Sequence, residues 1–153
     1  PSLWVEDVRK AQIPTTPAAG AMAGESFVVQ RAVIENGVLS LRHESSGAAP
    51  GHEFMLFLFL NGRSPAGRNF QVIPESRVGS LHVHMKRSVK SEKNPEAQIF
   101  MNGYGLRLEF AERVGNEIPG RIYLCMPDAA KSYVAGVFRA RVLDKEEITI
   151  SRR

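Results

Sequence analysis

The stretch Ala32-Val-Ile-Glu-Asn-Gly-Val-Leu-Ser-Leu41 carries the clearest β signal in the chain, because a turn pair, Asn-Gly, stands between two β-prone runs. An Asn-Gly pair accepts positive φ at both central positions of a type I′ turn, which a two-residue β-hairpin requires. If the pair forms that turn, Ile34 faces Leu39 and Ala32 faces Leu41. Both apolar pairs then lie on one face, so the sequence predicts an antiparallel hairpin with this register.

Further strand signals follow along the chain. The run 104–110 alternates apolar and polar residues, and the runs 120–126 and 132–142 are joined by the short loop 127–131. Turn residues recur at intervals of roughly ten residues, which is typical of a β-sandwich or barrel. We therefore predict an all-β fold: a single antiparallel β-sandwich of about eight or nine strands.

The run Phe54-Met-Leu-Phe-Leu-Phe-Leu60 is apolar at every position, in contrast to the alternating strands. A strand of this kind is typically covered on both faces. We therefore expect it to be central, with both Phe57 and Leu58 buried although they point in opposite directions. Seven apolar residues are too few for a transmembrane helix, so no transmembrane segment is expected.

The N-terminal part differs in texture from the rest. Residues 1–25 contain three prolines and many small residues and read as an extended tail or connector, whereas residues 26–153 form the β-sandwich domain. The tail either lies along its own sandwich or crosses to a neighbouring subunit, and we favour the second arrangement slightly because it would also cover an edge strand such as 145–151. Its expected anchors are the apolar positions Leu3, Trp4, Val5, Val8 and Ile13.

Composition excludes several classes of function. The 153 residues include 20 Lys and Arg against 16 Asp and Glu, a net charge of +4 that is too small and too dispersed for a typical nucleic-acid-binding protein. The three aspartates, Asp7, Asp128 and Asp144, lie far apart, which argues against a calcium loop. The chain starts at Pro1, so we expect a soluble protein that has either lost a leader, and is then extracytoplasmic, or been excised from a longer chain.

Two histidines, His82 and His84, stand two residues apart in the predicted strand 81–86. Residues at that spacing project from the same face, so Leu81, Val83 and Met85 should enter the core and the histidines should point outward. Two adjacent imidazoles can bind a transition metal such as zinc or copper, provided that at least one more ligand joins them. The alternative is a polar sheet face, and the neighbouring cation of Lys86 disfavours a bound dication.

The candidates for a catalytic nucleophile are weaker than the histidine pair. Cys125 is a single cysteine inside a predicted strand, where it should act as a small buried hydrophobe. Asp128, Lys131 and Ser132 lie close in sequence, but no nucleophile-elbow pattern surrounds them. A loop rich in these residue types is typical of a hairpin turn. The sequence therefore favours a non-catalytic protein over an enzyme.

A third candidate is a recognition surface of tyrosine and arginine. Arg121 and Tyr123 share one face of their predicted strand, and Arg107 points outward from another. If these strands are neighbours, such side chains form an interface for protein or carbohydrate, whereas the alternative is that the tyrosines are half-buried cross-strand partners. The preferred interpretation is a non-catalytic binding or self-assembly module whose partner is itself or another protein. The alternative is a metal-binding protein or metal-dependent enzyme that uses the His82–His84 pair.

Overall fold

The computed structural model describes residues 3–44, 51–76, 81–87 and 96–143, and it confirms the all-β class. The described residues form one 3-10 helix and eleven strands. These elements are η1 (Val8–Lys10), β1 (Ala19–Met22), β2 (Glu25–Val28), β3 (Arg31–Glu35), β4 (Val38–His43), β5 (His52–Phe57), β6 (Asn69–Val72), β7 (His82–Arg87), β8 (Glu96–Phe100), β9 (Gly105–Phe110), β10 (Glu117–Cys125) and β11 (Tyr133–Leu143).

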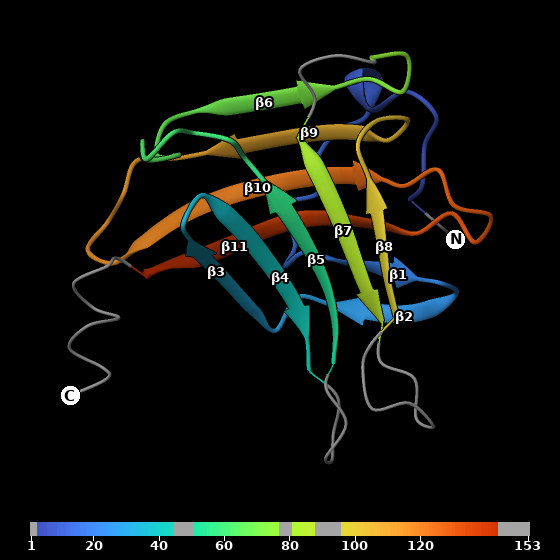
Figure 1. The fold of residues 1–153 in the computed structure, drawn as a ribbon, viewed down its shortest axis with the longest axis horizontal. Helices are drawn as coiled ribbons and strands as arrows, with labels where there is room; N and C mark the ends of the chain where they lie inside the picture. Colours follow the sequence, from blue (N-terminus) through green and yellow to red (C-terminus); the bar gives the residue numbers. More distant parts are fainter. Residues whose placement is uncertain (1–2, 45–50, 77–80, 88–95, 144–153) are drawn as a thin grey trace.

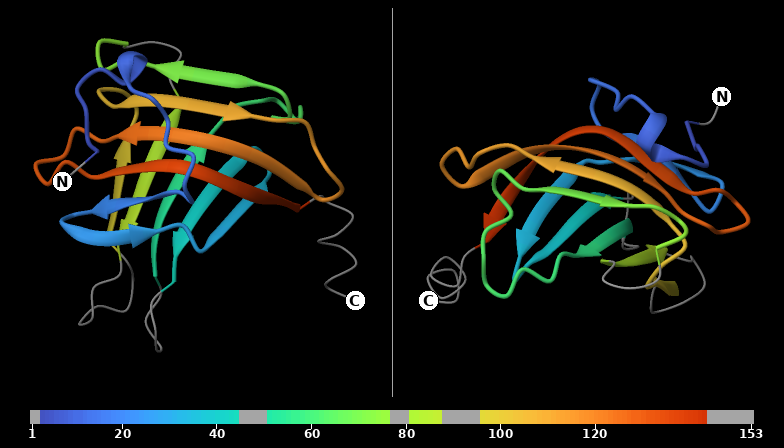
Figure 2. Two further views of the ribbon diagram at one scale, coloured as in Figure 1. Left: turned by 180° about the vertical axis from the view of Figure 1, so that it is seen from behind. Right: turned by 90° about the horizontal axis from the view of Figure 1, so that it is seen from above.

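The strands form one curled sheet in the order β6-β9-β10-β11-β3-β4-β5-β7-β8, and the β1–β2 hairpin is attached to β11. Figure 1 shows β9, β10 and β11 running behind the steeply inclined β4, β5 and β7, and the view from above in Figure 2 shows the two halves facing each other. The predicted two-sheet sandwich is therefore not what this chain forms. The prediction of purely antiparallel pairing is also wrong, because β11 and β3 pair in parallel between residues 141–143 and 33–35.

The hairpin prediction is confirmed in register and in turn geometry. Ile34 pairs with Leu39 and Ala32 with Leu41. Asn36 and the following glycine have φ values of 52° and 76°, the left-handed conformations that a type I′ turn demands. The local sequence therefore determines this part of the sheet without help from distant contacts.

Replacing Gly37 by valine should lower the free energy of unfolding by roughly 1 kcal/mol or more, because a β-branched residue is strained at positive φ. A Cβ atom at Gly37 would meet nothing within 4 Å, so conformation alone carries the effect. Gly37→Asn is the matched control and should be nearly neutral, since asparagine tolerates the left-handed region. Urea denaturation of the three proteins tests this, and a valine variant as stable as the wild type would contradict it.

The main hydrophobic core lies between the two facing halves of the sheet. Leu106, Leu108 and Phe110 of β9 enter it as the alternation predicts, and the long β10 and β11 supply alternate residues along most of their length. Because all these strands contribute one apolar face to the same interior, the curl of the sheet encloses a single core.

The prediction for the run 54–60 holds for one face only. Phe54, Leu56 and Leu58 are buried in the core, whereas Phe57 is only half-buried and Phe59 is 58% exposed. The expectation that Phe57 is buried is therefore wrong for the single chain. Within the described chain the inner face of β5 is packed in the core, whereas Met55 and Phe57 on its outer face are half-buried and Phe59, just beyond the strand, is exposed.

The segment predicted as a tail is partly built into the sheet. Residues 19–22 form β1, which pairs with β2 and with the start of β11. Before that point, η1 and its flanking residues pack on the outer face of β9 and β10, the side seen from behind in Figure 2. The predicted edge strand 145–151 lies outside the described residues.

Candidate functional site

The uncovered outer face of β5, β7 and β8 is the most distinctive surface of the described chain. It faces the viewer in Figure 1, away from β9–β11. Phe57 of β5 pairs in register with His82 of β7, and His84 pairs with Ile99 of β8. We call this surface the aromatic–histidine face and define it by six residues: Phe57, Phe59, His82, His84, Ile99 and Met101.

Three members of this face are large hydrophobic side chains that solvent reaches freely. Phe59, Ile99 and Met101 are 58%, 61% and 54% exposed. Single exposed hydrophobic residues are ordinary, but a contiguous group on a sheet face indicates an interaction surface. The charged residues of the same outer face, Arg42, Glu53 and Lys86, lie toward the opposite ends of the strands, and Arg42 and Glu53 form an ion pair at 2.9 Å.

The backbone at Phe59 is strained in a way that places its ring on this face. Phe59 has φ 50°, in the left-handed region that a bulky residue rarely adopts. Its ring packs edge-on against the imidazole of His82, with the ring centroids 4.8 Å apart. A strained residue that exposes a large apolar ring is more typical of a functional surface than of a packed core.

The two predicted site histidines point outward, as the alternation of β7 requires. Leu81, Val83 and Met85 are buried and the histidines are half-buried. The His84 ring lies 4.3 Å from that of Phe57, so both imidazoles rest on aromatic rings. Burial, followed by the charge of Lys86 and the neighbouring His82, lowers the pKa of His84 below its ordinary value. The imidazole of His84 is therefore neutral at physiological pH.

Within the described residues, no group of three or more His, Cys, Asp or Glu side chains could hold a metal ion. His82 and His84 are thus brought together as predicted, but no third ligand from the same described chain joins them. The other two histidines, His43 and His52, lie at the end of β4 and the start of β5 and belong to a separate cluster.

β8 adds an unpaired edge beside the aromatic–histidine face. It hydrogen-bonds to β7 on one side, and no other described strand pairs with its second side. Edge strands are usually protected by lysine, proline or a bulge, yet Glu96–Phe100 contains neither lysine nor proline. Its single charged residue, Glu96, is paired with Arg87 at 2.9 Å.

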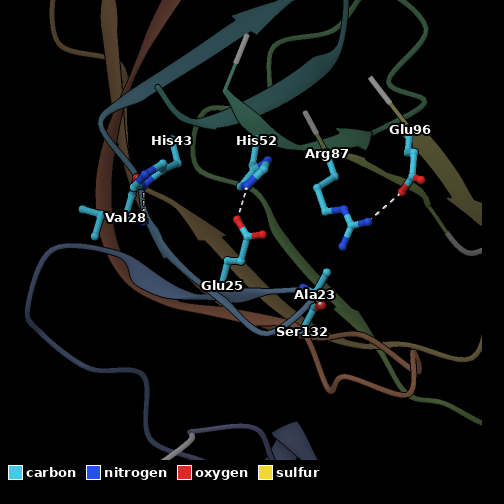
Figure 3. Close-up of polar contacts among 8 residues, drawn as sticks. All are labelled: Ala23, Glu25, Val28, His43, His52, Arg87, Glu96 and Ser132. Atoms are coloured by element: carbon cyan, nitrogen blue, oxygen red, sulfur yellow. Dashed lines mark hydrogen bonds and ion pairs between the residues drawn. The ribbon is translucent and has the colours of Figure 1, made fainter. Parts of the chain in front are cut away.

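A polar cluster ties the β1–β2 hairpin to β4 and β5, as Figure 3 shows. His52 Nε2 lies 2.9 Å from a carboxylate oxygen of Glu25, and this hydrogen bond holds the pKa of Glu25 below its usual value. The backbone N–H of Val28 donates to Nδ1 of His43 at 2.9 Å. Each of these groups bridges two elements of the fold, so the cluster stabilises the hairpin and offers no free nucleophile or base.

The Asp128–Lys131–Ser132 loop likewise has a structural explanation. Ser132 is completely buried; its hydroxyl donates to Asp128 at 2.5 Å and accepts the backbone N–H of Ala23 at 2.9 Å. Lys131 instead places its Nζ 4.7 Å from the centre of the Trp4 ring. Ser132 therefore stabilises the loop of the β10–β11 hairpin, which agrees with the interpretation of this loop as a turn.

The tail anchors lie on the sheet of their own chain in this structure. Val8 and Ile13 are buried against the outer face of β10 and β11, Trp4 and Val5 are partly buried there, and Leu3 is 44% exposed. Trp4 Nε1 donates to the carbonyl of Met126 at 2.8 Å. A tail exchanged with a neighbouring subunit would make the same contacts, so that arrangement stays a proposal.

The buried surface beneath the tail includes Cys125. Its sulfur accepts a hydrogen bond from the backbone N–H of Val5 at 3.3 Å, and burial raises the pKa of the thiol to about 11. A thiol with such a pKa is protonated at neutral pH and unreactive. This agrees with the prediction that Cys125 is a small buried hydrophobe.

The predicted tyrosine–arginine surface is assembled but largely occupied. β9, β10 and β11 are neighbours, and Arg107, Arg121 and Tyr123 share their outer face. Tyr123 is only 3% exposed because the tail covers it, and its hydroxyl donates to the Leu3 carbonyl at 2.5 Å. Both arginines contact Glu109, at 3.3 Å and 2.5 Å. The tyrosine on this surface thus leaves little ring area on which a sugar could stack.

A shallow hollow of about 640 Å³ continues this outer surface beyond the tail. Pro17, Pro119 and Val137 form apolar parts of its wall, while Arg121 and Arg139 stand among its charged residues. The Arg121–Glu109 ion pair neutralises one of these arginines. The hollow is also lined by Phe110 and Phe138, but both rings are buried in the core, so it presents fewer exposed large hydrophobic side chains than the aromatic–histidine face.

Phe59, Ile99 and Met101 were not predicted from the sequence as site residues. A signal was present, because β5 is apolar on both faces and the run Ala97-Gln-Ile-Phe-Met101 places Ile99 and Met101 opposite Phe100. Pattern alone could not show which of the two apolar faces stays open. That depends on which distant strands fold over them.

Comparisons with protein-family models, curated proteins and solved structures were made for the whole chain. None of them found a match. The function must therefore be argued from the side chains and their geometry. Among the described residues, the helical structure is limited to η1, and no helix is long and apolar enough to cross a membrane.

Proposed function

We propose that the protein is a non-catalytic self-assembly module in which two copies stack through their aromatic–histidine faces. One observation carries the proposal: Phe54 and Leu56 on the inner side of β5 are fully buried, whereas Met55 and Phe57 on the outer side are only half-buried and the adjoining Phe59 is 58% exposed. A strand with this composition is normally covered on both faces. In the proposed assembly, the sheet of a second copy packs on the outer face of β5.

A second copy is the partner that best fits the chemistry of the face. The chain carries a net charge of +4, so two copies repel each other unless they meet through an uncharged surface. The six residues of the face carry no carboxylate, ammonium or guanidinium group. Contacts between identical subunits are also more apolar than those between transient partners.

The stacked arrangement would produce across two subunits the two-layer architecture that the sequence predicted within one. Sheets that pack face to face lie about 10 Å apart and bury one apolar face each. The two uncovered β5 strands would then share one interior. The alternative is that this face binds a hydrophobic surface of another protein. That alternative is supported if the chain is monomeric and its aromatic–histidine face is protected from solvent only in a complex with another protein.

Replacing Ile99 by lysine should abolish this assembly. Ile99 is 61% exposed in the single chain, so the variant should keep the fold and its melting temperature within a few degrees. A charge buried at the centre of an apolar interface has no partner and strongly weakens association. We expect a wild-type dimer and an Ile99→Lys monomer in sedimentation velocity at micromolar concentration.

Val114→Lys is the matched control for this experiment. Val114 is 66% exposed in the turn before β10, so it introduces the same charge at another exposed hydrophobic position. This variant should remain dimeric. A wild-type chain that stays monomeric up to about 100 μM, which means an association free energy weaker than about −5.5 kcal/mol, would overturn the proposal. An Ile99→Lys variant that remains a dimer would also overturn it.

A further inference from the structure

Two of the four histidines have no hydrogen-bonding partner in the described part of the chain. The ring nitrogens of His43 and His52 are engaged with Val28 and Glu25. Within the described residues, His82 and His84 instead contact the rings of Phe59 and Phe57. No described protein group hydrogen-bonds to these two half-buried imidazoles, so their ring nitrogens can bind a ligand in place of solvent.

The geometry of the pair suits a shared ion. Same-face neighbours on a strand are separated by about 7 Å, which allows both imidazoles to reach one ion between them. Their other sides rest on aromatic rings, with centroid distances of 4.3 Å and 4.8 Å, so the rings are already oriented. Nitrogen ligands of this type select zinc, copper or nickel over calcium or magnesium.

One chain supplies only half of such a site. A structural zinc ion takes four ligands in tetrahedral geometry, and no third ligand joins the pair within the described residues. In a two-fold stack of the aromatic–histidine faces, a pair near the symmetry axis meets the same pair from the second copy. We propose that the His82–His84 pairs of two copies together bind one zinc-class ion between the stacked faces.

This inference rests on the proposed self-assembly, because the second pair of ligands comes from the second copy. One nearby charge disfavours a bound cation: Lys86 lies two residues after His84 on the same face of β7. Glu53 pairs with Lys86 in register on β5, but its carboxylate is already ion-paired with Arg42 at 2.9 Å, so these three residues keep a net positive charge.

Sedimentation equilibrium of the full chain, in EDTA and with added zinc chloride, tests the site. At a free zinc concentration about ten times its dissociation constant, linkage should tighten the dimer by about tenfold. Mass spectrometry of the metal content should find one zinc ion per two chains. The double variant His82→Ala/His84→Ala should lose both effects, whereas the control His52→Gln, at a histidine outside the face, should retain them.

The outcomes separate this inference from the proposed function. A dimer that neither binds nor responds to zinc, or a response that survives in the double variant, overturns the zinc site and leaves self-assembly standing. One zinc ion bound per monomer also overturns the site. A chain that stays monomeric with and without zinc overturns both. Zinc-dependent dimers that the double variant abolishes support the shared site.

Discussion

Replacing Phe54 by alanine should lower the free energy of unfolding by about 3–5 kcal/mol. Phe54 is completely buried in the main core, and its ring meets that of Phe27 edge-on with centroids 4.9 Å apart. The substitution removes a large apolar side chain and also one of the contacts between β5 and the β1–β2 hairpin. Chemical denaturation followed by circular dichroism measures the loss. Phe54→Leu, which keeps most of the volume, should cost about 1 kcal/mol.

Phe57→Ala is the matched control on the opposite face of the same strand. Phe57 is half-buried and contacts the His84 ring, so its loss should cost about 1–2 kcal/mol in a monomer. The comparison is best made in the Ile99→Lys background, which removes any contribution from assembly. Equal losses for Phe54→Ala and Phe57→Ala in that background would show that the outer face of β5 is covered within one chain, and the proposed interface would lose its basis.

Replacing Gly20 by alanine should detach the β1–β2 hairpin from β11 and destabilise the protein by about 3 kcal/mol. A Cβ atom at Gly20 would lie 1.9 Å from the carbonyl oxygen of Tyr133 and 2.7 Å from its carbonyl carbon. These are backbone atoms that no rotamer change can move. The hairpin must therefore shift and lose part of its pairing with residues 133–135. Hydrogen exchange should show faster exchange in β1 and β2 than in β9 and β10.

Gly24→Ala is the control for this substitution because it lies in the same hairpin without a close neighbour. Gly24 has φ +85° and nothing within 4 Å of an added Cβ, so alanine there suffers backbone strain alone. The expected cost is about 1 kcal/mol. If Gly20→Ala costs no more than Gly24→Ala, β1 can adjust to the extra methyl group, and close backbone approach is not what requires glycine at position 20.

Much of the candidate site was predictable from the sequence. The alternation in residues 81–86 places His82 and His84 on the outward face, because a strand turns successive side chains to opposite sides whatever lies around it. The run 54–60 also indicated that the outer face of this strand is apolar. The prediction that the chain buries Phe57 on this face was wrong, because a sequence pattern indicates the composition of a face and not which element packs on it.

Other features depended on contacts between distant parts of the chain. Nothing in the sequences of β3 and β11 indicates that they pair in parallel, because a parallel ladder joins segments whose turns are elsewhere. The tail gives a similar case. Its apolar anchors were recognisable, but the surface that receives Val8 and Ile13 exists only after β9, β10 and β11 have assembled.

The sequence by itself determined the all-β class, the hairpin at Asn36–Gly37 with its register, and the direction in which His82 and His84 point. Each of these follows from interactions within a few residues, where turn geometry and the two-residue period of a strand leave little choice. Long-range contacts decide instead that the described strands form one curled, mixed sheet, and that no other described strand or helix packs over the outer face of β5, β7 and β8. The curl of the sheet and the covering of its faces depend on many long-range contacts. The same local sequence pattern is compatible with several tertiary arrangements of the strands.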